Sequence, residues 1–474
     1  MLNKNRKQGI APLLLFVTTM LAADCNTKPI KTAATVGGGT VTAATNNCQQ
    51  QLLCRTLYEA AAKGCVVCIE ALLAGNPDVN LKDNDGNAPL HLAADCGHAS
   101  CIEALIEGGA NVDLKDNDGS APLHLAAYCG HASCIEALIE GGANVDLKDN
   151  DGYAPLHWAA SCGHATCIEA LIEGGANVDL KDNDGYAPLR LAAFCGHASC
   201  IEALIEGGAN VDLKDNNGRA PLHWAASCGH ATCIEALIKK GANVDLQDDD
   251  KGTAPLHWAA GAGHLSCIEA LIKKGANVDL QDNNGYAPLH FAARNGHATC
   301  IEALIEKGAN VDLQDNDKAA LHWAARNGHA TCIEALIEGG ADVDLKDNDG
   351  RAPLHWAAYC GHATCIEALI KKGANVNLQD NYGYAPLHWA ADKGHATCIE
   401  ALIEGGANVN LQNNNGDAPL HFAAGLGHLS CIEALIKKGA NVNLQNYKKD
   451  TPLHLARRFG RQECIKFLQA NGRK

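Results

Sequence analysis

From residue 48 onward, apolar and polar positions follow one pattern that repeats every 33 residues. In the unit that starts at Asp83, a polar Asp-Asn-Asp-Gly turn is followed by Ala-Pro-Leu-His-Leu-Ala-Ala, in which Pro begins a short helix that ends at the Gly before His98. Cys101, Ala104 and Leu105 share one face at i, i+3 and i+4, which predicts a second helix. Gly-Gly-Ala-Asn ends that helix, and we expect Val-Asp-Leu to run extended into the next turn.

The His of Pro-Leu-His marks the successive units. It stands at positions 91, 124, 157, 223, 257, 290, 322, 355, 388, 421 and 454, and Arg190 fills the remaining slot. One step has 34 residues, near Asp250, and one has 32, near Lys318; both changes fall in the turn, where loops tolerate them. Because one unit cannot bury its apolar face alone, the units are expected to stack into a solenoid.

The elements Gly-x-Ala-Pro-Leu-His-x-Ala-Ala-x-x-Gly-His and Ala-Leu-Ile-x-x-Gly-Ala-Asn-Val resemble the ankyrin-repeat family. Twelve full units run from about Asp83 to Gly472, and a degenerate unit with Leu57 in the Leu90 slot precedes them. The resemblance implies an all-α repeat solenoid over residues 48–474, with short β-hairpin loops and about 13 repeats, including degenerate N-terminal and C-terminal caps. It is closest in character to the long ankyrin-repeat proteins of host-associated bacteria, which engage host proteins.

One departure from the family concerns the start of the first helix. The family usually has Thr before Pro-Leu-His, and here Ala fills that position in eleven units, with Thr451 the exception. A missing hydroxyl cap costs about 1 kcal/mol per helix end. We therefore expect a low stability per repeat.

The N-terminus is typical of an export signal. Lys4, Arg6 and Lys7 precede an apolar run from Ile10 to Ala23, which is short for a membrane span and suits a secretory signal peptide over residues 1–23. Residues 24–47 then form a low-complexity tether. Cys25 resembles the lipidated Cys of bacterial lipoproteins, although Asp24 stands where that family has a small residue. We expect an exported protein, either secreted or tethered to the cell envelope through a lipid on Cys25.

The formal net charge of −16 changes the expected class of partner. Nucleic-acid phosphates require clustered Lys and Arg, so nucleic acid is not expected as a partner. An acidic body favours protein partners with basic patches.

Cysteine and histidine recur too regularly to indicate a metal centre. Cys-x-His-x-x-Cys begins at Cys96 and recurs in five other units, but its first Cys is replaced in the remaining full units, which argues against zinc. The second Cys occurs in all thirteen units on the apolar helix face, where it acts as a small hydrophobe. A local Cys96–Cys101 disulfide is the alternative. All 22 His occupy two slots, Pro-Leu-His and Gly-His, which the resemblance assigns to hydrogen bonds between adjacent repeats. No catalytic residue, metal site or cofactor is predicted.

Variation between the repeats of this one chain points to the candidate binding residues. The residue after Asp-Asn-Asp-Gly and the two residues before Gly-His vary strongly, and Tyr and Arg are favoured anchors of protein interfaces. The resemblance places these slots on the concave face. The candidates are Tyr128, Tyr153, Tyr186, Phe194, Arg219, Tyr286, Arg294, Arg326, Arg351, Tyr359 and Tyr384.

Two alternatives stay open for these slots and for the tryptophans. Neutral drift among duplicated units would also produce the variation. All six Trp (158, 224, 258, 323, 356 and 389) occupy one slot of the first helix, where we interpret them as packing between repeats, with partner contact as the alternative.

The pattern as a whole favours a monomeric, non-enzymatic scaffold that binds a host protein through its concave face. A surface-tethered spacer or lipoprotein without a specific partner is the other function that fits.

Overall fold

The computed structural model describes residues 54–472. The chain divides into two units, Met1–Gln51 and Leu52–Lys474, and the described residues belong to the second. The predicted signal peptide (1–23), the predicted tether (24–47) and the candidate lipid anchor Cys25 lie outside the described residues, so export and lipidation stay predictions. Between residues 54 and 472, no helix is both long enough and apolar enough to cross a membrane.

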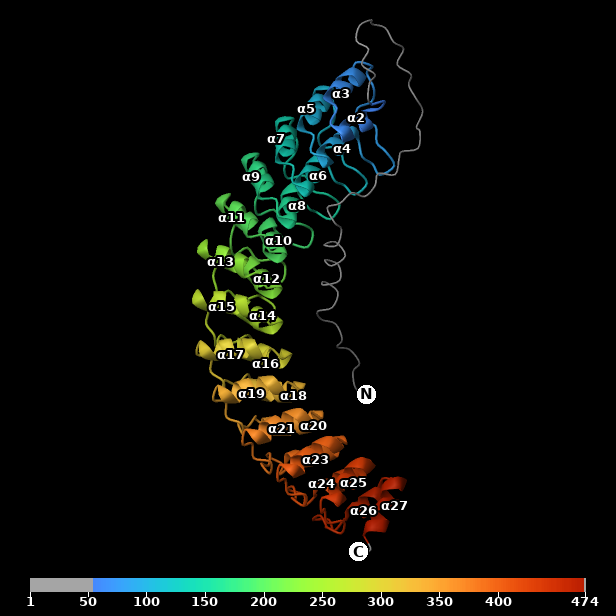
Figure 1. Ribbon diagram of the computed structural model, residues 1–474, viewed down its shortest axis with the longest axis vertical. Coiled ribbons are helices and arrows are strands. Elements are labelled where there is room, and N and C mark those ends of the chain that lie inside the picture. Colours follow the sequence, from blue (N-terminus) through green and yellow to red (C-terminus); the bar gives the residue numbers. More distant parts are fainter. Residues whose placement is uncertain (1–53, 473–474) are drawn as a thin grey trace. The chain divides into compact units, whose positions relative to one another are not determined.

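The second unit is built from 13 pairs of short helices stacked one after another (Figure 1). The first helices of the pairs are α2 (Leu57–Lys63), α4 (Pro89–Asp95), α6 (Pro122–Cys129), α8 (Pro155–Cys162), α10 (Pro188–Cys195), α12 (Pro221–Cys228), α14 (Pro255–Ala262), α16 (Pro288–Asn295), α18 (Ala320–Asn327), α20 (Pro353–Cys360), α22 (Pro386–Lys393), α24 (Pro419–Leu426) and α26 (Pro452–Arg458). The second helices are α3 (Val66–Leu73), α5 (Ala99–Glu107), α7 (Ala132–Glu140), α9 (Ala165–Glu173), α11 (Ala198–Glu206), α13 (Ala231–Lys239), α15 (Leu265–Lys273), α17 (Ala298–Glu306), α19 (Ala330–Glu338), α21 (Ala363–Lys371), α23 (Ala396–Glu404), α25 (Leu429–Lys437) and α27 (Gln462–Asn471).

Each helix packs against its equivalents in the repeats before and after it, so the two kinds of helix form two layers. Within this unit, the first helices lie on the inner side of the curved stack and the second helices on the outer side (Figure 1). The predicted all-α solenoid of about 13 repeats is confirmed, and α2 and α3 form its degenerate first repeat.

The core lies between the two layers and repeats with the sequence. Leu90 and Ala93 of a first helix and Cys101, Ile102 and Leu105 of the following second helix are each at most 1% exposed. The Cys of the second helix is buried in all thirteen repeats, which confirms its apolar role. Burial raises the pKa of Cys200 and of Cys365 to about 12, so these thiols are protonated at neutral pH.

The turns between repeats are closed by an Asp at their first position. Asp149 N–H donates to the carbonyl of Tyr153 (2.9 Å), and its Oδ1 accepts the N–H groups of Asp151 (3.0 Å) and Tyr153 (2.8 Å). These contacts close a hairpin loop without regular strands. Among residues 54–472, β-pairing is limited to one isolated bridge between Gln314 and Ala319.

The expectation of an extended Val-Asp-Leu segment is wrong. Leu147 N–H donates to the carbonyl of Asn144 (3.2 Å), and Asn144 Oδ1 accepts the N–H of Asp146 (3.1 Å). An Asn side chain that bonds the backbone two residues on favours a turn over an extended segment.

The His of Pro-Leu-His bonds the backbone at the start of the first helix, but it does not replace the missing hydroxyl, which in the Thr451 repeat accepts a different N–H. Ala154, which precedes α8, offers no side-chain acceptor, as predicted. His157 Nδ1 accepts the N–H of Ala154 (3.1 Å), and His157 Nε2 donates to the carbonyl of Tyr186 in the next repeat (3.1 Å). One imidazole therefore accepts a backbone N–H at the start of its own helix and bonds that helix to the turn of the next repeat.

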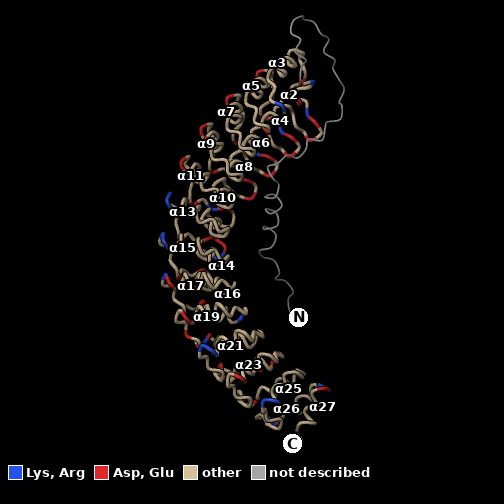
Figure 2. The backbone as a smooth tube through the Cα atoms, in the orientation of Figure 1, with Lys and Arg blue, Asp and Glu red and all other residues tan. Residues whose placement is uncertain are grey.

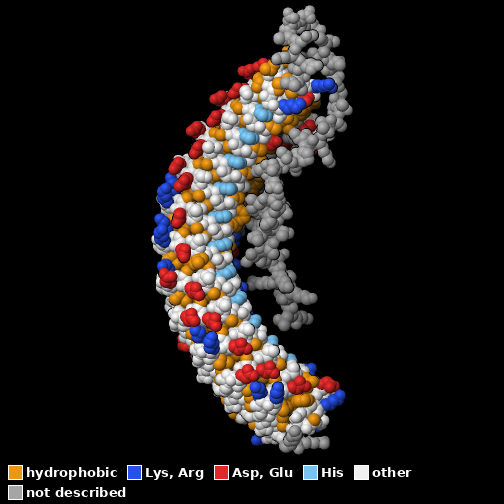
Figure 3. All heavy atoms as spheres, viewed as in Figure 1, with side chains coloured by type: hydrophobic (Ala, Val, Ile, Leu, Met, Phe, Trp, Pro, Cys, Tyr) orange, Lys and Arg blue, Asp and Glu red, His pale blue; other side chains and the backbone are white. Residues whose placement is uncertain are grey.

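The His of Gly-His connects each repeat to the one before it. His131 Nε2 donates to the carbonyl of Asp95 (3.1 Å) and His164 Nε2 to that of Tyr128 (3.0 Å). In the last repeat, Arg461 Nε makes the equivalent bond to Gly425 (3.0 Å). Figure 3 shows His side chains in a row along the stack. The structure therefore confirms that both His rows bond between repeats.

Candidate protein-interaction surface

The eleven candidate binding residues all lie on the first helices or on the turns that precede them. None of them is buried. Tyr128 (42% exposed), Arg294, Arg326 and Tyr359 (39%) are exposed, and the other seven are half-buried. The structure thus brings the candidates to one face of the solenoid, and we call this face the first-helix surface.

The tryptophans are held in place by the carboxylates that close the turns. Trp158 Nε1 donates to Asp149 Oδ2 (3.0 Å), and Trp356 Nε1 donates to Asp347 Oδ2 (2.9 Å). Since Oδ1 of Asp149 already accepts two turn N–H groups, one carboxylate fixes both the turn and the indole. In the repeat with the extra residue, Thr253 Oγ1 accepts the bond from Trp258 instead (3.1 Å).

Aromatic side chains of neighbouring repeats pack on these indoles. The Tyr128 ring lies edge-on to Trp158 of the next repeat, with ring centres 5.5 Å apart. Tyr359 lies between Trp356 of its own repeat (5.9 Å) and Trp389 of the next (5.5 Å). The tryptophans therefore pack between repeats, as interpreted, while Trp158, Trp356 and Trp389 stay partly exposed on the same surface.

Arginines bridge the indoles of successive repeats. The Arg219 guanidinium carbon lies 5.5 Å from the ring centre of Trp224 and 4.6 Å from that of Trp258. Arg326 and Arg351 make the same kind of pair of contacts with the tryptophans at 323, 356 and 389, at 4.9 to 5.5 Å. Cation–π contacts of this length contribute about 0.5–2 kcal/mol each. They also hold the guanidinium groups in fixed positions on the surface.

Arg190 behaves differently from the other arginines. It replaces the His of Pro-Leu-His, is 5% exposed, and lies 3.8 Å from the Tyr186 ring centre and 4.0 Å from that of Trp224. Burial lowers its pKa from the ordinary value. Aromatic rings rather than a carboxylate surround this cation, so Arg190 supports the inner packing of the surface and is not accessible to a partner.

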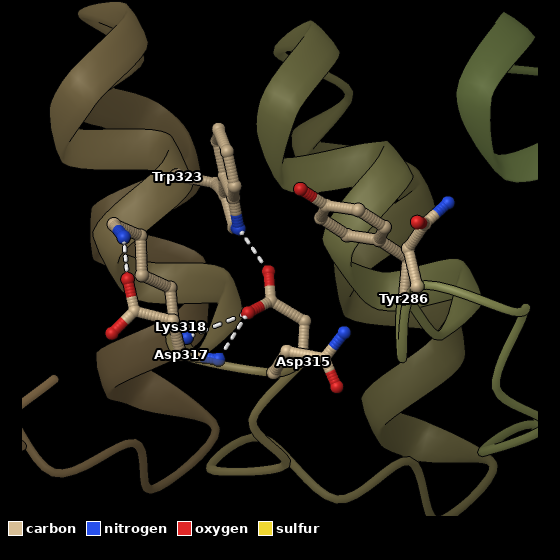
Figure 4. A pocket seen from close by; sticks show the side chains of 7 residues that line it. Tyr286, Asp315, Asp317, Lys318 and Trp323 are labelled. Atoms are coloured by element: carbon tan, nitrogen blue, oxygen red, sulfur yellow. Dashed lines mark hydrogen bonds and ion pairs between the residues drawn. The ribbon is translucent and has the colours of Figure 1, made fainter. Parts of the chain in front are cut away.

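A first hollow, of about 460 Å³, lies at the repeat that lacks one residue. Its lining includes Tyr286, Asp315, Asp317, Lys318 and Trp323 (Figure 4). Tyr286 and Trp323 lie on opposite sides, with the Asp315 carboxylate between them. The Asp315 N–H donates to the carbonyl of Lys318, three residues on (2.9 Å). In the preceding repeat, the Asp282 N–H donates to the carbonyl of Tyr286, four residues on. The hollow therefore lies at a turn one residue shorter than its equivalents.

A second hollow, of about 340 Å³, is lined by His355 together with three cations and three aromatic rings: Arg326, Arg351, Lys393, Trp356, Tyr359 and Trp389. Arg351 pairs with Asp349 (3.0 Å) and Lys393 with Asp392 (3.0 Å). Among the described residues, Arg326 pairs with no carboxylate. This hollow offers a positive charge to a ligand.

The second helices present a different charge. Glu107, Glu140, Glu173 and Glu206 are exposed at the ends of α5 to α11, and Lys residues take their place at the ends of α13 and α15 (Figure 2). The excess negative charge of the chain is therefore not uniform. Exposed glutamates end α5 to α11 and further Asp residues lie in the turns, whereas the second hollow is lined by cations.

Sequence reasoning missed part of this surface. It interpreted the tryptophans as packing between repeats, with partner contact as the alternative, and did not include Lys318 or Lys393, which contact the rings of Trp356 (4.8 Å) and Tyr359 (4.7 Å). The sequence spacing could have revealed that the indoles bond the turns. In most of the Trp-containing repeats, the Trp follows the turn-closing Asp by nine residues. The Cys-x-His-x-x-Cys elements are brought to no common site, because each His bonds the preceding repeat and the second Cys is buried.

Comparison with known families finds ankyrin repeats along the chain. A model of ankyrin repeats (3 copies) matches residues 20–116, 57–149, 98–182, 156–248, 241–315, 321–413 and 387–474. A model of ankyrin repeats (many copies) matches residues 299–337. No curated protein matches the chain. Among solved structures, the chain is similar to the human ASB11 ankyrin repeat domain, at 31% identity over 47% of this chain and 99% of that chain, with a TM-score of 0.44.

Proposed function

We propose, from the premise that this chain belongs to the ankyrin-repeat family, that it is a scaffold whose first-helix surface binds a protein partner. Ankyrin repeats are generally protein–protein interaction modules, and proteins of this family are typically non-enzymatic. We further propose that the partner is a host protein and that the scaffold is a monomer.

The observation that carries the proposal is the fixed arrangement of large side chains on the first-helix surface. Trp, Tyr and Arg dominate the energetics of protein interfaces. Here hydrogen bonds to turn carboxylates and ring contacts between repeats hold them before any partner arrives. Side chains that are already ordered lose little entropy on binding, so more of their contact energy appears as affinity. Neutral drift alone would not require Trp356 and Trp389 to be held at the surface in this way.

The second hollow supports a more specific proposal about the bound segment. Arg326, Arg351 and Lys393 surround it, and Arg326 lacks a carboxylate partner among the described residues. An acidic side chain flanked by apolar residues would pair with the guanidinium of Arg326 and cover the partly exposed indoles of Trp356 and Trp389. A partner with basic patches, as the net charge predicts, would instead meet the exposed glutamates of α5 to α11. One partner could use both, with its acidic segment on the inner side.

The test replaces five tyrosines of the first-helix surface by Ala: Tyr128, Tyr153, Tyr286, Tyr359 and Tyr384. Loss of one interface anchor costs about 2 kcal/mol, or about 30-fold in affinity, so five losses should abolish capture of a partner that the wild-type chain cross-links in its native host. Far-UV circular dichroism should be unchanged, because none of the five is buried.

The matched control replaces five exposed glutamates of the second helices by Ala: Glu103, Glu136, Glu169, Glu302 and Glu367. Capture should persist in this variant. If capture is lost in the Glu variant and kept in the Tyr variant, the binding surface is the other face. If the wild-type chain captures no partner reproducibly, the spacer function is favoured.

Export is proposed on the sequence alone, from the basic residues before Ile10 and the apolar run to Ala23. We expect the mature chain in its native host to lack residues 1–22 or 1–23 by intact mass. An acyl mass increase on Cys25 would identify a lipid-tethered form, and a retained Met1 would contradict export by this signal.

A further inference from the structure

The first repeat departs from the others at one position of its second helix. In eleven repeats the residue after the loop Gly is His, and in the last it is Arg461; in the first it is Cys65. Cys65 precedes α3 as its N-terminal cap residue, and Cys68, the apolar-face Cys common to all repeats, follows three residues later. The first repeat therefore carries a thiol three residues before its core thiol, which no other repeat does.

A third thiol joins these two from the segment before α2. Cys54 is 1% exposed, Cys68 is 3% exposed and Cys65 is half-buried. The three sulfur atoms all lie within 4.8 Å of one another, and Cys65 Sγ is 2.8 Å from Cys68 Sγ. Within residues 54–472, no other group of three or more Cys, His, Asp or Glu side chains converges in this way.

The chemistry of three converging sulfurs suits a soft or borderline metal ion. Zinc bonds thiolate at about 2.3 Å with tetrahedral angles, which places its sulfur ligands about 3.8 Å apart. The sulfur–sulfur distances in the group are 2.8 Å between Cys65 and Cys68 and at most 4.8 Å for the other pairs. Each distance therefore needs to change by about 1 Å at most to fit zinc. A disulfide would use two thiols and leave the third unexplained.

We propose that Cys54, Cys65 and Cys68 bind one zinc ion at the N-terminal end of the solenoid. Each thiol releases its proton to solvent as the metal–sulfur bond forms. Cys65 is the half-buried member of the group, and a ligand from outside the group fills the fourth coordination position.

The place of the group in the fold gives the metal a structural role. Among residues 54–472, the first repeat contacts the repeat that follows it, and repeat arrays depend on contacts between neighbours. Cys54 lies before α2, whereas Cys65 and Cys68 lie at the start of α3. A metal bound to all three would fasten the segment before α2 to the start of α3 and so stabilise the first repeat.

The experiment uses the full chain, reduced and stripped of metal, and titrates it with Co²⁺. Tetrahedral thiolate coordination gives Co²⁺ a sulfur-to-metal charge-transfer band and strong visible bands. We expect one such site per chain, displaced by an equivalent of Zn²⁺. Zn²⁺ should also slow hydrogen exchange in α2 and α3 and leave α16 and α17 unchanged.

Two variants test the ligands. Cys65→Ser, at a half-buried position, should weaken Co²⁺ binding at least about tenfold, since even outer-shell changes cost 10–100-fold. The triple change of Cys54, Cys65 and Cys68 to Ser should abolish the bands. The matched triple change of Cys96, Cys129 and Cys162 to Ser removes three half-buried thiols elsewhere and should leave binding unchanged.

Three results would overturn the proposal: no tetrahedral Co²⁺ spectrum in the wild type, a Cys65→Ser variant that binds as tightly as the wild type, or equal loss in the matched triple variant. A Cys65–Cys68 disulfide that re-forms after reduction and excludes the metal would overturn it as well.

Discussion

Acidification from pH 7 to pH 5 should strongly destabilise the solenoid. Burial lowers the pKa of His157, His355 and His388 to about 4, and the hydrogen bond from the preceding Ala N–H to Nδ1 in each requires a neutral ring. In the unfolded chain the same His titrates near 6.5. The unfolded state therefore binds protons that the folded state excludes, and stability is lost as pH falls below about 6.5.

The expected size follows from proton linkage. At pH 5.5, each His with a folded pKa of about 4 contributes about 1.4 kcal/mol of lost stability, so the three together contribute about 4 kcal/mol. Burial also lowers the pKa of the equivalent His in seven other repeats, which adds to the loss: 91, 124, 223, 257, 290, 322 and 421. Carboxylates titrate mainly below pH 5 in the unfolded chain, so this window isolates the His contribution.

The measurement is the urea midpoint by circular dichroism from pH 7.5 to 5. His157→Gln should be less stable at pH 7 but should lose about 1.4 kcal/mol less on acidification to pH 5.5, because one titrating site is gone. His454→Gln, at an exposed position, should follow the wild-type profile. A midpoint that stays constant between pH 7 and pH 5 would contradict the neutral, doubly bonded His.

The repeat fold could be predicted because its determinants are local. Pro at the first helical position, Gly after the first helix and an apolar stripe on the second helix recur with a fixed period, and each unit contacts only its neighbours. Pro155 begins α8 and Gly163, with φ +86°, ends it, as the pattern predicts. The Val-Asp-Leu segment was mispredicted because apolar alternation carries no information about the Asn side chain that bends it.

The candidate surface could be predicted only in part. Variation between repeats identified Tyr and Arg positions that the structure places together, since side chains at equivalent positions of a stack must share a face. The first hollow lies at the shortened turn near Lys318. The second is lined by Arg326, Arg351 and Lys393 around indoles, an arrangement that depends on side-chain conformation and could not be predicted from the sequence pattern. The group of Cys54, Cys65 and Cys68 was missed because the sequence analysis considered what the repeats share. The group depends on Cys65, which stands where other repeats have His or Arg.

Gly163→Ala should destabilise the solenoid far more than Gly175→Ala, although both glycines have nearly the same backbone conformation. Their φ angles are +86° and +90°, a region that costs an L-residue about 1–2 kcal/mol. A Cβ on Gly163 would lie 2.8 Å from Cε1 and Nδ1 of His197 in the next repeat, whereas a Cβ on Gly175 would meet no atom within 4 Å.

The ring of His197 cannot move aside without cost. Its Nε2 donates to the carbonyl of Ser161 (3.1 Å), and His197 is also the residue from which α11 begins. Forcing an extra methyl into a packed contact costs about 1–3 kcal/mol. We therefore expect Gly163→Ala to cost about 1–3 kcal/mol more than Gly175→Ala in urea unfolding, with hydrogen exchange accelerated in α9 and α11.

A double-mutant cycle separates the clash from the backbone strain. In a His197→Ala background the ring is absent, so Gly163→Ala should cost no more than Gly175→Ala does in the same background. The difference between backgrounds is then the coupling between the Gly of one repeat and the His of the next. If Gly163→Ala costs the same with and without His197, the Gly-His pair is not a packing contact between repeats. Its recurrence along the chain would then reflect only the left-handed backbone and the His hydrogen bond.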